Sequence, residues 1–409
     1  MSHAAMITSV EDWLTDQALG SPSIATMYRE VCVRLSVIGI PIARSMITWP
    51  ILHPLIKIET ALWRRDQNVV LEQYPHREKE SEEWQRSPLK HLLDAGQVLM
   101  RRRLSGPEAL IDFPLLADLA EQGYTDYLAM VTEFTVPRMG KDQHETGILI
   151  SWASDRPSGF SDEDIIALRR IQRGFAVACR TVIQARIANN ITETYLGRHA
   201  AEQVLAGNIR RGDGITTKAV ILYSDLRDST KLAETLDHDD YLALLNDYYE
   251  CSASAAIDAG GEVLAFIGDA VLSVFALSET MVYEDAIRAA SLSVQDAIAR
   301  GDAVNRTRRE TGLAPFRFGV SASVGEVMLG NIGVPTRLTF SVIGPAVNAA
   351  ARIEKLTKTV GAQALATAAI AAVFPDCWQS IGPHRLDGMA TPVELYRLRE
   401  DMSYQAAVA

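Results

Sequence analysis

Residues 262–275 read EVLAFIGDAVLSVF, which is two apolar runs separated by Gly268-Asp269. Apolar runs around a Gly-Asp pair predict a β-hairpin with a carboxylate at its tip. Residues 219–230 read AVILYSDLRDST, and there another apolar strand ends in Asp225 before a helix. An aspartate in a turn ordinarily only hydrogen-bonds to nearby backbone. Two carboxylates at strand ends of one sheet can instead hold a pair of hard divalent cations, and we interpret Asp225 and Asp269 in this way.

The overall composition limits the classes of protein to consider. The chain has 409 residues and a formal net charge of −11, which predicts two or three domains and argues against a nucleic-acid-binding protein. The 4 cysteines form no Cys-x-x-Cys pair and the 8 histidines form no zinc motif, so we expect a cytoplasmic protein with reduced thiols. We find no signal peptide and no apolar run long enough to span a bilayer.

The first part of the chain predicts two helices followed by strands. Apolar residues recur at roughly helical spacing within residues 1–20, at Val10, Trp13, Leu14 and Leu19. A second helix is expected to begin at Ser21-Pro22-Ser23 and to run to Gly39. Residues 42–74 are rich in alternating apolar residues and are expected to form strands.

Charged residues and a helix cap follow. The stretch 76–86 is highly charged and is expected to be an exposed helix or loop. Ser87 and Pro88 predict the N-cap and the first residue of a helix. We interpret Arg101–Arg103 as a solvated or partner-facing basic patch, with an anion-binding site as the alternative.

A helix over 114–122 and strands over 124–134 and 146–153 complete this half, with a Lys-Asp-Gln-His turn between the two strands. The order of helix, strands, helix, antiparallel strands and a long helix resembles a GAF or PAS-type sensory module. That resemblance implies an α+β domain. Such a domain could bind a small ligand between its sheet and helices, or it could be a dimerisation module without a ligand.

A long helix is expected to follow. Ser161 and Asp164 have the spacing of a capping box. Apolar residues then recur at steps of three and four, at Leu168, Ile171, Phe175, Ala178, Val182 and Ala185. This pattern is typical of a coiled-coil seam, and the alternative is a helix packed on its own domain. The helical pattern runs through 186–207 and is broken at 209–214, where we expect the domain boundary.

From residue 217 the pattern changes to alternating strands and helices, as in an α/β domain. Beyond the hairpin, strands are expected at 218–224, 316–324, 337–343, 377–382 and 393–398, with a glycine-rich strand and turn at 325–333. Helices are expected at 227–236, 239–258, 280–311 and 344–356.

Segment 218–398 resembles the class III nucleotidyl cyclase catalytic domain, the homology domain of adenylate and guanylate cyclases. The motifs SDLRDST (224–230), FIGDAVLSVF (266–275) and VIGPAVNAAARIE (342–354) match in order and spacing, and FGVSASVGEVMLGNIG (318–333) matches the connecting strand. The resemblance implies a ferredoxin-like catalytic domain. More weakly, the preceding half resembles the sensory region of soluble bacterial cyclases.

The resemblance implies a reaction in which the ribose 3′-hydroxyl attacks the α-phosphate in line and expels pyrophosphate. A hydroxyl is a poor nucleophile at neutral pH, and two metal ions can both acidify it and neutralise the triphosphate. We expect Asp225 and Asp269 to bridge two divalent ions, Mg²⁺ or Mn²⁺, and the family pattern implies that the Leu226 backbone carbonyl completes one site.

Asn348 and Arg352 lie four residues apart on one predicted helix, so their side chains share a face. The resemblance implies that Asn348 orients the ribose and that Arg352 stabilises charge on the α-phosphate in the transition state. In this family the metal aspartates and the Asn/Arg pair face each other across a head-to-tail dimer. A chain that carries all four residues is therefore expected to form a homodimer with two active sites.

The predicted purine-reading positions depart from the family pattern. Ala265 occupies the position where adenylate cyclases usually carry lysine and guanylate cyclases glutamate. Ser341 occupies the other base-reading position, and its hydroxyl can hydrogen-bond to adenine. A site without the second polar reader should lose roughly 1–3 kcal/mol of selectivity. We therefore expect modest activity or relaxed base choice.

The phosphate-reading positions also depart from the family. Asp228 stands where the family often has glycine, and a carboxylate there would repel a triphosphate unless it points away. Asp387 stands where the family often has a lysine that reaches the terminal phosphates, and Arg385 or Arg337 could substitute for it.

These observations predict a three-part chain, with a GAF-like regulatory domain over 1–160, a signalling helix and connector over 161–214 and a cyclase domain over 215–409. We expect an adenylate cyclase that makes cyclic AMP from ATP and is regulated by a small molecule or protein at its N-terminal domain. A guanylate or relaxed-specificity cyclase is one alternative. A degenerate cyclase-like protein that binds nucleotide without turnover is the other.

Overall fold

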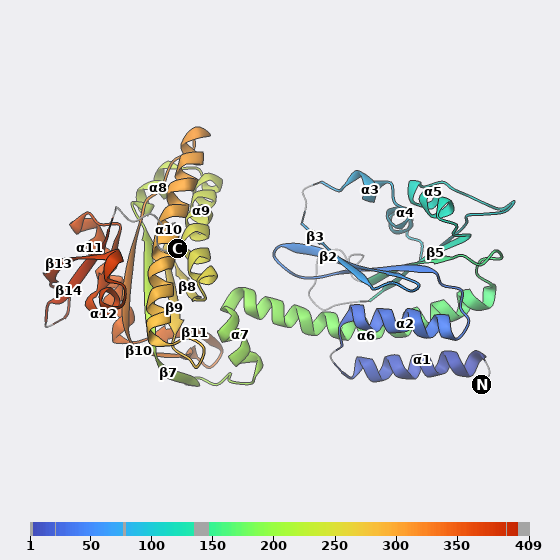
Figure 1. The fold of residues 1–409 in the computed structure, drawn as a ribbon, viewed down its shortest axis with the longest axis horizontal. Coiled ribbons are helices and arrows are strands. Elements are labelled where there is room, and N and C mark those ends of the chain that lie inside the picture. The colour runs from blue at the N-terminus through green and yellow to red at the C-terminus, as the bar shows by residue number, and fades with distance from the viewer. Residues whose placement is uncertain (1–2, 21, 77–78, 135–146, 390, 400–409) are drawn as a thin grey trace. The chain divides into compact units, whose positions relative to one another are not determined.

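The computed structural model describes residues 3–20, 22–76, 79–134, 147–389 and 391–399. The chain divides into two compact units, Met1–Thr194 and Tyr195–Ala409. Figure 1 shows both units with their elements labelled. The predicted Lys-Asp-Gln-His turn lies outside the described residues. Among the described residues, none of the helices combines the length and apolar character needed to cross a membrane.

The N-terminal unit is built on an antiparallel sheet of six strands in the order β3-β2-β1-β6-β5-β4. Its strands are β1 (Arg44–Pro50), β2 (Ile56–Arg64), β3 (Val70–Pro75), β4 (Leu99–Arg103), β5 (Asp126–Glu133) and β6 (Gly147–Ser154). The predicted strands over 42–74, 124–134 and 146–153 are confirmed, while β4 was not predicted as a strand.

Helices cover both faces of this sheet. The helices on one face are α1 (His3–Ala18), α2 (Ile24–Val37) and α6 (Asp162–Leu196). Those on the other face are α3 (Glu82–Gln85), α4 (Pro88–Asp94) and α5 (Pro114–Glu121). Figure 1 shows these two sets on opposite sides of the strands. The unit is thus an α+β domain, and its assignment to the GAF or PAS class stays a prediction.

The N-terminal helix departs from its predicted apolar face at one end. Val10 and Leu14 are buried, but Leu19 is 85% exposed. The helix α1 ends at Ala18. Leu19 follows the helix and therefore does not continue its buried face. The prediction for Leu19 was therefore wrong.

Helix α6 begins as its sequence predicts. The Ser161 backbone N–H donates to the Asp164 carboxylate at 2.8 Å, and the Asp164 N–H donates to Ser161 Oγ at 3.1 Å, which confirms the capping box. The predicted seam does not form a coiled coil in this chain. Leu168, Ile171 and Phe175 are at most 1% exposed and belong to the core of the N-terminal unit. The alternative, a helix packed on its own domain, is correct for this part of α6.

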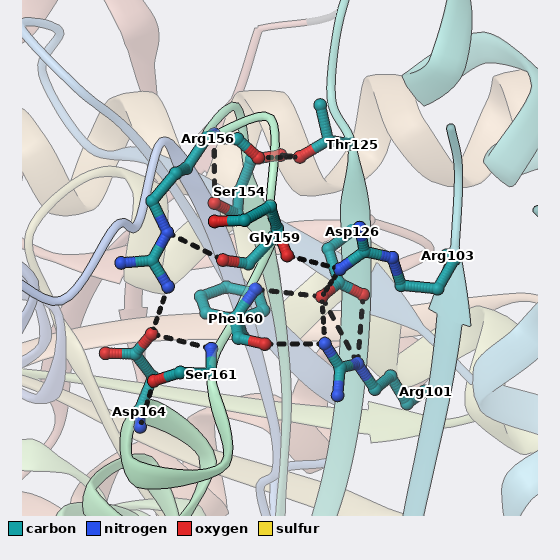
Figure 2. A network of polar contacts seen from close by, with 11 residues as sticks. Arg101, Arg103, Thr125, Asp126, Ser154, Arg156, Gly159, Phe160, Ser161 and Asp164 are labelled. Carbon is teal, nitrogen blue, oxygen red and sulfur yellow. Dashed lines mark hydrogen bonds and ion pairs between the residues drawn. The ribbon is translucent and has the colours of Figure 1, made fainter. Parts of the chain in front are cut away.

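The arginines 101–103 form neither a solvated patch nor an anion site, so both interpretations were wrong. Arg101 and Arg103 both bind Asp126, which is fully buried, at 2.7 and 3.3 Å. Figure 2 shows the two guanidinium groups converging on this carboxylate. Arg102 instead binds Asp112 at 2.9 Å. Strand β4 alternates its side chains, so Arg102 points to the opposite face, and all three charges are compensated within the domain.

The C-terminal unit contains a larger sheet in the order β13-β14-β12-β10-β7-β9-β8, with β11 paired to β10. Its strands are β7 (Gly214–Leu226), β8 (Glu262–Ile267), β9 (Ala270–Ala276), β10 (Phe318–Val334), β11 (Arg337–Ile343), β12 (Ala364–Thr367), β13 (Trp378–His384) and β14 (Val393–Leu398). Its helices are α7 (Arg198–Leu205), α8 (Ser229–Thr235), α9 (His238–Asp258), α10 (Tyr283–Glu310), α11 (Pro345–Val360) and α12 (Ala368–Val373).

The centre of this sheet has the predicted ferredoxin-like arrangement. The strands β7, β8, β9 and β10, with α9 and α10 between them, follow the β-α-β-β-α-β order, and in space they lie as β10-β7-β9-β8. The hairpin over 262–275 is confirmed as β8 and β9. The glycine-rich stretch 325–333 continues β10 rather than turning. The short β12 and α12 were not predicted.

The connector between the units is interrupted at one glycine. Gly197 has φ +83° and separates α6 from α7, so the helical pattern is not continuous through 186–207. Ala200 and Ala201 on α7 are fully buried in the C-terminal unit. The compact units therefore differ from the predicted division: most of α6 packs with the N-terminal domain and α7 with the C-terminal one.

Candidate active site

The sheet brings Asp225 and Asp269 to neighbouring strand ends. In the pairing of β7 with β9, Asp225 lies opposite Ala270, the residue directly after Asp269. The Leu226 backbone N–H donates to the Asp269 backbone carbonyl at 3.3 Å. The hairpin turn at Gly268-Asp269 is thus held against the end of β7, and the two carboxylates that the sequence singled out lie side by side.

Asp225 forms no ion pair with any described residue, and Lys355 only partly offsets the burial and the negative charge around it. Its Oδ1 atom is buried and has no hydrogen-bond partner. Burial and the neighbouring Asp269 carboxylate raise the pKa of Asp225 to about 6. An orphaned carboxylate oxygen beside a second carboxylate is the donor set that a hard divalent cation completes, so the residues fit the expected metal ions. Within the described part of the chain, no cluster of three or more His, Cys, Asp or Glu forms a metal site.

A third carboxylate lies behind this pair. Glu354 on α11 is 6% exposed, and burial together with Asp225 raises its pKa to about 7. A Cβ atom at Gly319 would lie 2.4 Å from Glu354 Oε1. Gly319 is also paired with Asp225 across β10 and β7, so a glycine here is what lets Glu354 approach the site. Glu354 was not predicted as a site residue, because its place in the helical sequence pattern does not reveal that it faces the sheet.

The structure places Asn348 and Arg352 on α11, with Asn348 exposed and Arg352 half-buried. The Arg352 guanidinium lies beside Gly388, since a Cβ there would be 3.3 Å from its Nη2 atom. Among the described residues, no hydrogen bond or ion pair joins Asn348 or Arg352 to either aspartate or to any other side chain. Within one chain, the predicted site residues therefore form two groups, the two aspartates and the Asn/Arg pair, with no hydrogen bond or ion pair between the groups among the described residues.

The predicted base-reading residues lie on two strands that contact each other. Ala265 is on β8, opposite Leu272 and directly after a register shift. Ser341 is on β11, opposite Gly330. Strands β8 and β11 are in contact, and both residues are half-buried. The two positions thus lie in one region of the C-terminal unit, at which Ser341 supplies a hydroxyl and Ala265 supplies no polar group.

The Asp228 carboxylate is paired with two cations. It binds Arg317 at 3.1 Å and Lys358 at 3.3 Å, and Lys358 and Arg317 lower its pKa. The residue has φ +59°, in the left-handed region that favours glycine. This conformation explains why a glycine would fit the position. The two cations compensate the charge that was expected to repel a triphosphate.

Comparison with known proteins agrees with this geometry. Residues 215–368 match the family described as the adenylate and guanylate cyclase catalytic domain. An adenylate cyclase of Anabaena cylindrica is 34% identical over 163 residues, which are 40% of this chain and 32% of that protein. Adenylate cyclase 1 of Rhizobium meliloti (strain 1021) is 26% identical over 181 residues, 43% of this chain and 27% of that protein. The chain thus spans about a third or less of the length of these relatives.

Solved structures include the adenylyl cyclase CyaB from P. aeruginosa, with 25% identity and a TM-score of 0.41, covering 46% of this chain and 99% of that one. The guanylyl cyclase Cya2 has 27% identity and a TM-score of 0.41, covering 47% of this chain and 98% of that one. The carboxylate pair lies inside the part of the chain that the family model matches. Residues 215–368 are thus similar to the catalytic domain of adenylate and guanylate cyclases, the class III cyclases.

The carboxylate pair predicts an effect on stability. Because the pKa of Asp225 is raised to about 6, the metal-free folded state binds its proton more tightly than the unfolded chain does. Its stability should therefore fall as pH rises between about 4 and 6. Asp225→Asn should stabilise the chelator-treated protein at pH 8 by about 1–2 kcal/mol, after allowing for solvent screening, and by less at pH 4. Thermal unfolding at both pH values would measure this.

Asp228→Asn is the matched control. The pKa of Asp228 is lowered by Lys358 and Arg317, so its ionised form is favoured by folding and its removal should not stabilise the protein at pH 8. Destabilisation by Asp225→Asn at pH 8 would contradict the prediction, because it would show that repulsion between Asp225 and Asp269 does not destabilise the folded state.

Proposed function

We propose that this protein is an adenylate cyclase that converts ATP to cyclic AMP and pyrophosphate. The observation that carries the proposal is the orphaned Asp225 carboxylate beside Asp269, at paired strand ends of a class III cyclase domain. The two curated relatives named above are adenylate cyclases, which favours ATP over GTP. A guanylate or relaxed-specificity cyclase is the second candidate, because Ala265 offers no hydrogen bond to either base.

The chain's own residues would divide the work as follows. Asp225 and Asp269, with the backbone carbonyl of Leu226, would hold two divalent ions, Mg²⁺ or Mn²⁺. When bound, such ions acidify a ribose hydroxyl and neutralise a triphosphate. Arg352 has no counter-ion among the described residues, so its guanidinium is free to bind an α-phosphate whose negative charge grows in the transition state. Asn348 would orient the ribose.

The separation of the two groups of residues supports a homodimer. Asn348 is exposed on α11, and among the described residues no hydrogen bond or ion pair joins it or Arg352 to Asp225 or Asp269. A head-to-tail arrangement of two copies would bring the aspartates of one chain to the Asn/Arg pair of the other, and by symmetry it would create two sites.

Product identification is the experiment that tests the function. The purified full chain, incubated with ATP and separately with GTP in the presence of Mg²⁺ or Mn²⁺, should yield cyclic AMP from ATP, measured by mass spectrometry. Asp225→Ala should abolish the product without loss of folding. Cyclic products from both nucleotides would support the relaxed-specificity candidate. No cyclic product from folded, dimeric protein would contradict the enzyme and leave the nucleotide-binding protein without turnover.

Mixing two inactive variants tests the shared site. Asp225→Ala and Arg352→Ala should each be inactive alone. A heterodimer of the two would contain one intact site, so an equal mixture that exchanges subunits should regain up to about one quarter of wild-type activity. Activity that does not return, when co-purification of differently tagged subunits shows that mixed dimers have formed, would place both residues in a site within one chain.

We further propose that the N-terminal unit regulates the cyclase through α6. A cavity of about 720 Å³ lies between the start of α2, strand β3 and the later part of α6, a size that suits a small molecule. At its floor, the buried Glu59 accepts hydrogen bonds from Trp49 Nε1 at 3.0 Å and Gln73 Nε2 at 2.8 Å. Arg186 of α6 binds the same carboxylate at 2.7 Å. A ligand here would therefore touch the helix that leads to the cyclase domain.

The ion pair between the sheet and α6 can be tested directly. Arg186→Gln removes the only cation found on Glu59 among the described residues, so we expect basal cyclase activity to change at least twofold while the protein stays folded. Arg170→Gln is the control, because Arg170 also lies on α6 but pairs with Glu11 of α1, and neither residue lines the cavity. Equal rates for both variants and the wild type would argue against regulation through this contact.

A further inference from the structure

Two arginines lie next to each other on the N-terminal sheet, and neither has a counter-ion among the described residues. Arg44 begins β1 and Arg64 ends β2, and the two residues are directly paired across these strands. Directly paired residues present their side chains on the same face of a sheet. Arg44 is only 7% exposed and Arg64 is half-buried. Two like charges are thus held together at a mostly buried place.

Neither side chain of this arginine pair is compensated. Among the described residues, no hydrogen bond or ion pair is found for the guanidinium of Arg44 or of Arg64. The next residue, Arg65, binds Asp155 at 2.9 Å. The arginines of β4 all bind aspartates, and Figure 2 shows Arg101 and Arg103 on Asp126. Arg44 and Arg64 thus differ from the other arginines on or directly beside the strands of this sheet, Arg65 and Arg101–Arg103, which all bind aspartates.

Two buried hydroxyls on the same face also lack partners. Tyr127 Oη and Ser151 Oγ are buried, and neither makes a hydrogen bond of good geometry. The two hydroxyls lie near each other, since burial raises the pKa of Tyr127 and the Ser151 hydroxyl partly offsets that rise. Arg44 is paired with Ala153, and Ala153 is paired with Tyr127, so the three residues form one row across β1, β6 and β5. Ser151 lies two residues before Ala153 and therefore on the same face. Small side chains separate the arginine from both hydroxyls.

The arrangement of the two arginines is energetically unfavourable without an anion. A buried guanidinium without an anion loses hydration and gains nothing in return, and like charges on paired strands repel. Burial lowers the pKa of Arg44, and Arg64 lowers it further. Carboxylate and phosphate oxygens match the planar fork of a guanidinium and also accept hydrogen bonds from hydroxyls. One anionic group could therefore satisfy every unpartnered donor in this row.

We propose that Arg44 and Arg64, together with the hydroxyls of Tyr127 and Ser151, bind a small anion through its carboxylate or phosphate oxygens. The edge of the sheet gives access. Strand β3 pairs with β2 only as far as Leu62, so no paired strand flanks Arg64 on its outer side. The site is separate from the cavity beside Arg186, because Trp49 and Glu59 of that cavity belong to the opposite face of the sheet.

The experiment is thermal unfolding of the full chain against increasing sodium phosphate and, separately, sodium acetate, at constant ionic strength. Binding to the folded state should raise the midpoint with anion concentration. Arg44→Gln should melt no lower than wild type without the anion, because a buried uncompensated charge is removed, and its midpoint should no longer respond. Arg64→Gln should weaken the apparent affinity for the anion at least tenfold. Tyr127→Phe, which removes only one hydroxyl, should weaken it about threefold.

Arg65→Gln is the matched control, since Arg65 is the neighbouring arginine that already has a carboxylate partner, and it should keep the wild-type response. A response to phosphate alone or to acetate alone would assign the anion class. The proposal is overturned if neither anion raises the midpoint of the wild type, or if the response survives in Arg44→Gln and Arg64→Gln. This readout does not depend on turnover, so its failure would leave the proposed cyclase function untouched.

Discussion

The C-terminal domain holds two carboxylates side by side at the end of its sheet, and their mutual repulsion is the main physical constraint on this domain. The pairing of β7 with β9 and β10 fixes Asp225 beside the hairpin turn that carries Asp269. Glu354 adds a third acidic group, admitted by the missing side chain of Gly319. A fold that concentrates negative charge in this way is less stable without cations than it could be. The proposed cations would bind without rearrangement of the backbone, since the strands that hold the carboxylates are the central strands of the sheet.

Charge compensation separates the structural charged groups of both units from those that we propose to bind ligands. Asp126 and Asp228 each receive two cations within their own domain, and a carboxylate so bound has little left to offer a ligand. Arg352, Arg44 and Arg64 have no such partner among the described residues. Residues of one chemical type thus differ in their roles, and the neighbouring charges in the folded chain decide which role each has.

The sequence predicted the elements of the catalytic domain well, because local patterns decide them. The hairpin follows from apolar runs around Gly268-Asp269, and the start of α6 follows from its capping box. Packing partners were less accessible. The apolar seam of α6 looked like a coiled coil because an amphipathic stripe does not state which surface covers it. Asp126 could not be assigned to Arg101, since 25 residues separate them in sequence. The same limit concealed Glu354 and the pairing of Arg44 with Arg64.

The break at Gly197 has a mechanical consequence. A continuous helix can carry a twist from end to end, but a single residue at φ +83° interrupts the hydrogen bonding that would transmit torque. Beyond the break, α7 is anchored by its His199 N–H, which donates to Glu262 at 2.8 Å. Glu262 is the first residue of β8, the strand that runs to the turn bearing Asp269. A displacement of α7 would therefore act directly on β8 and, through it, on the turn that carries Asp269.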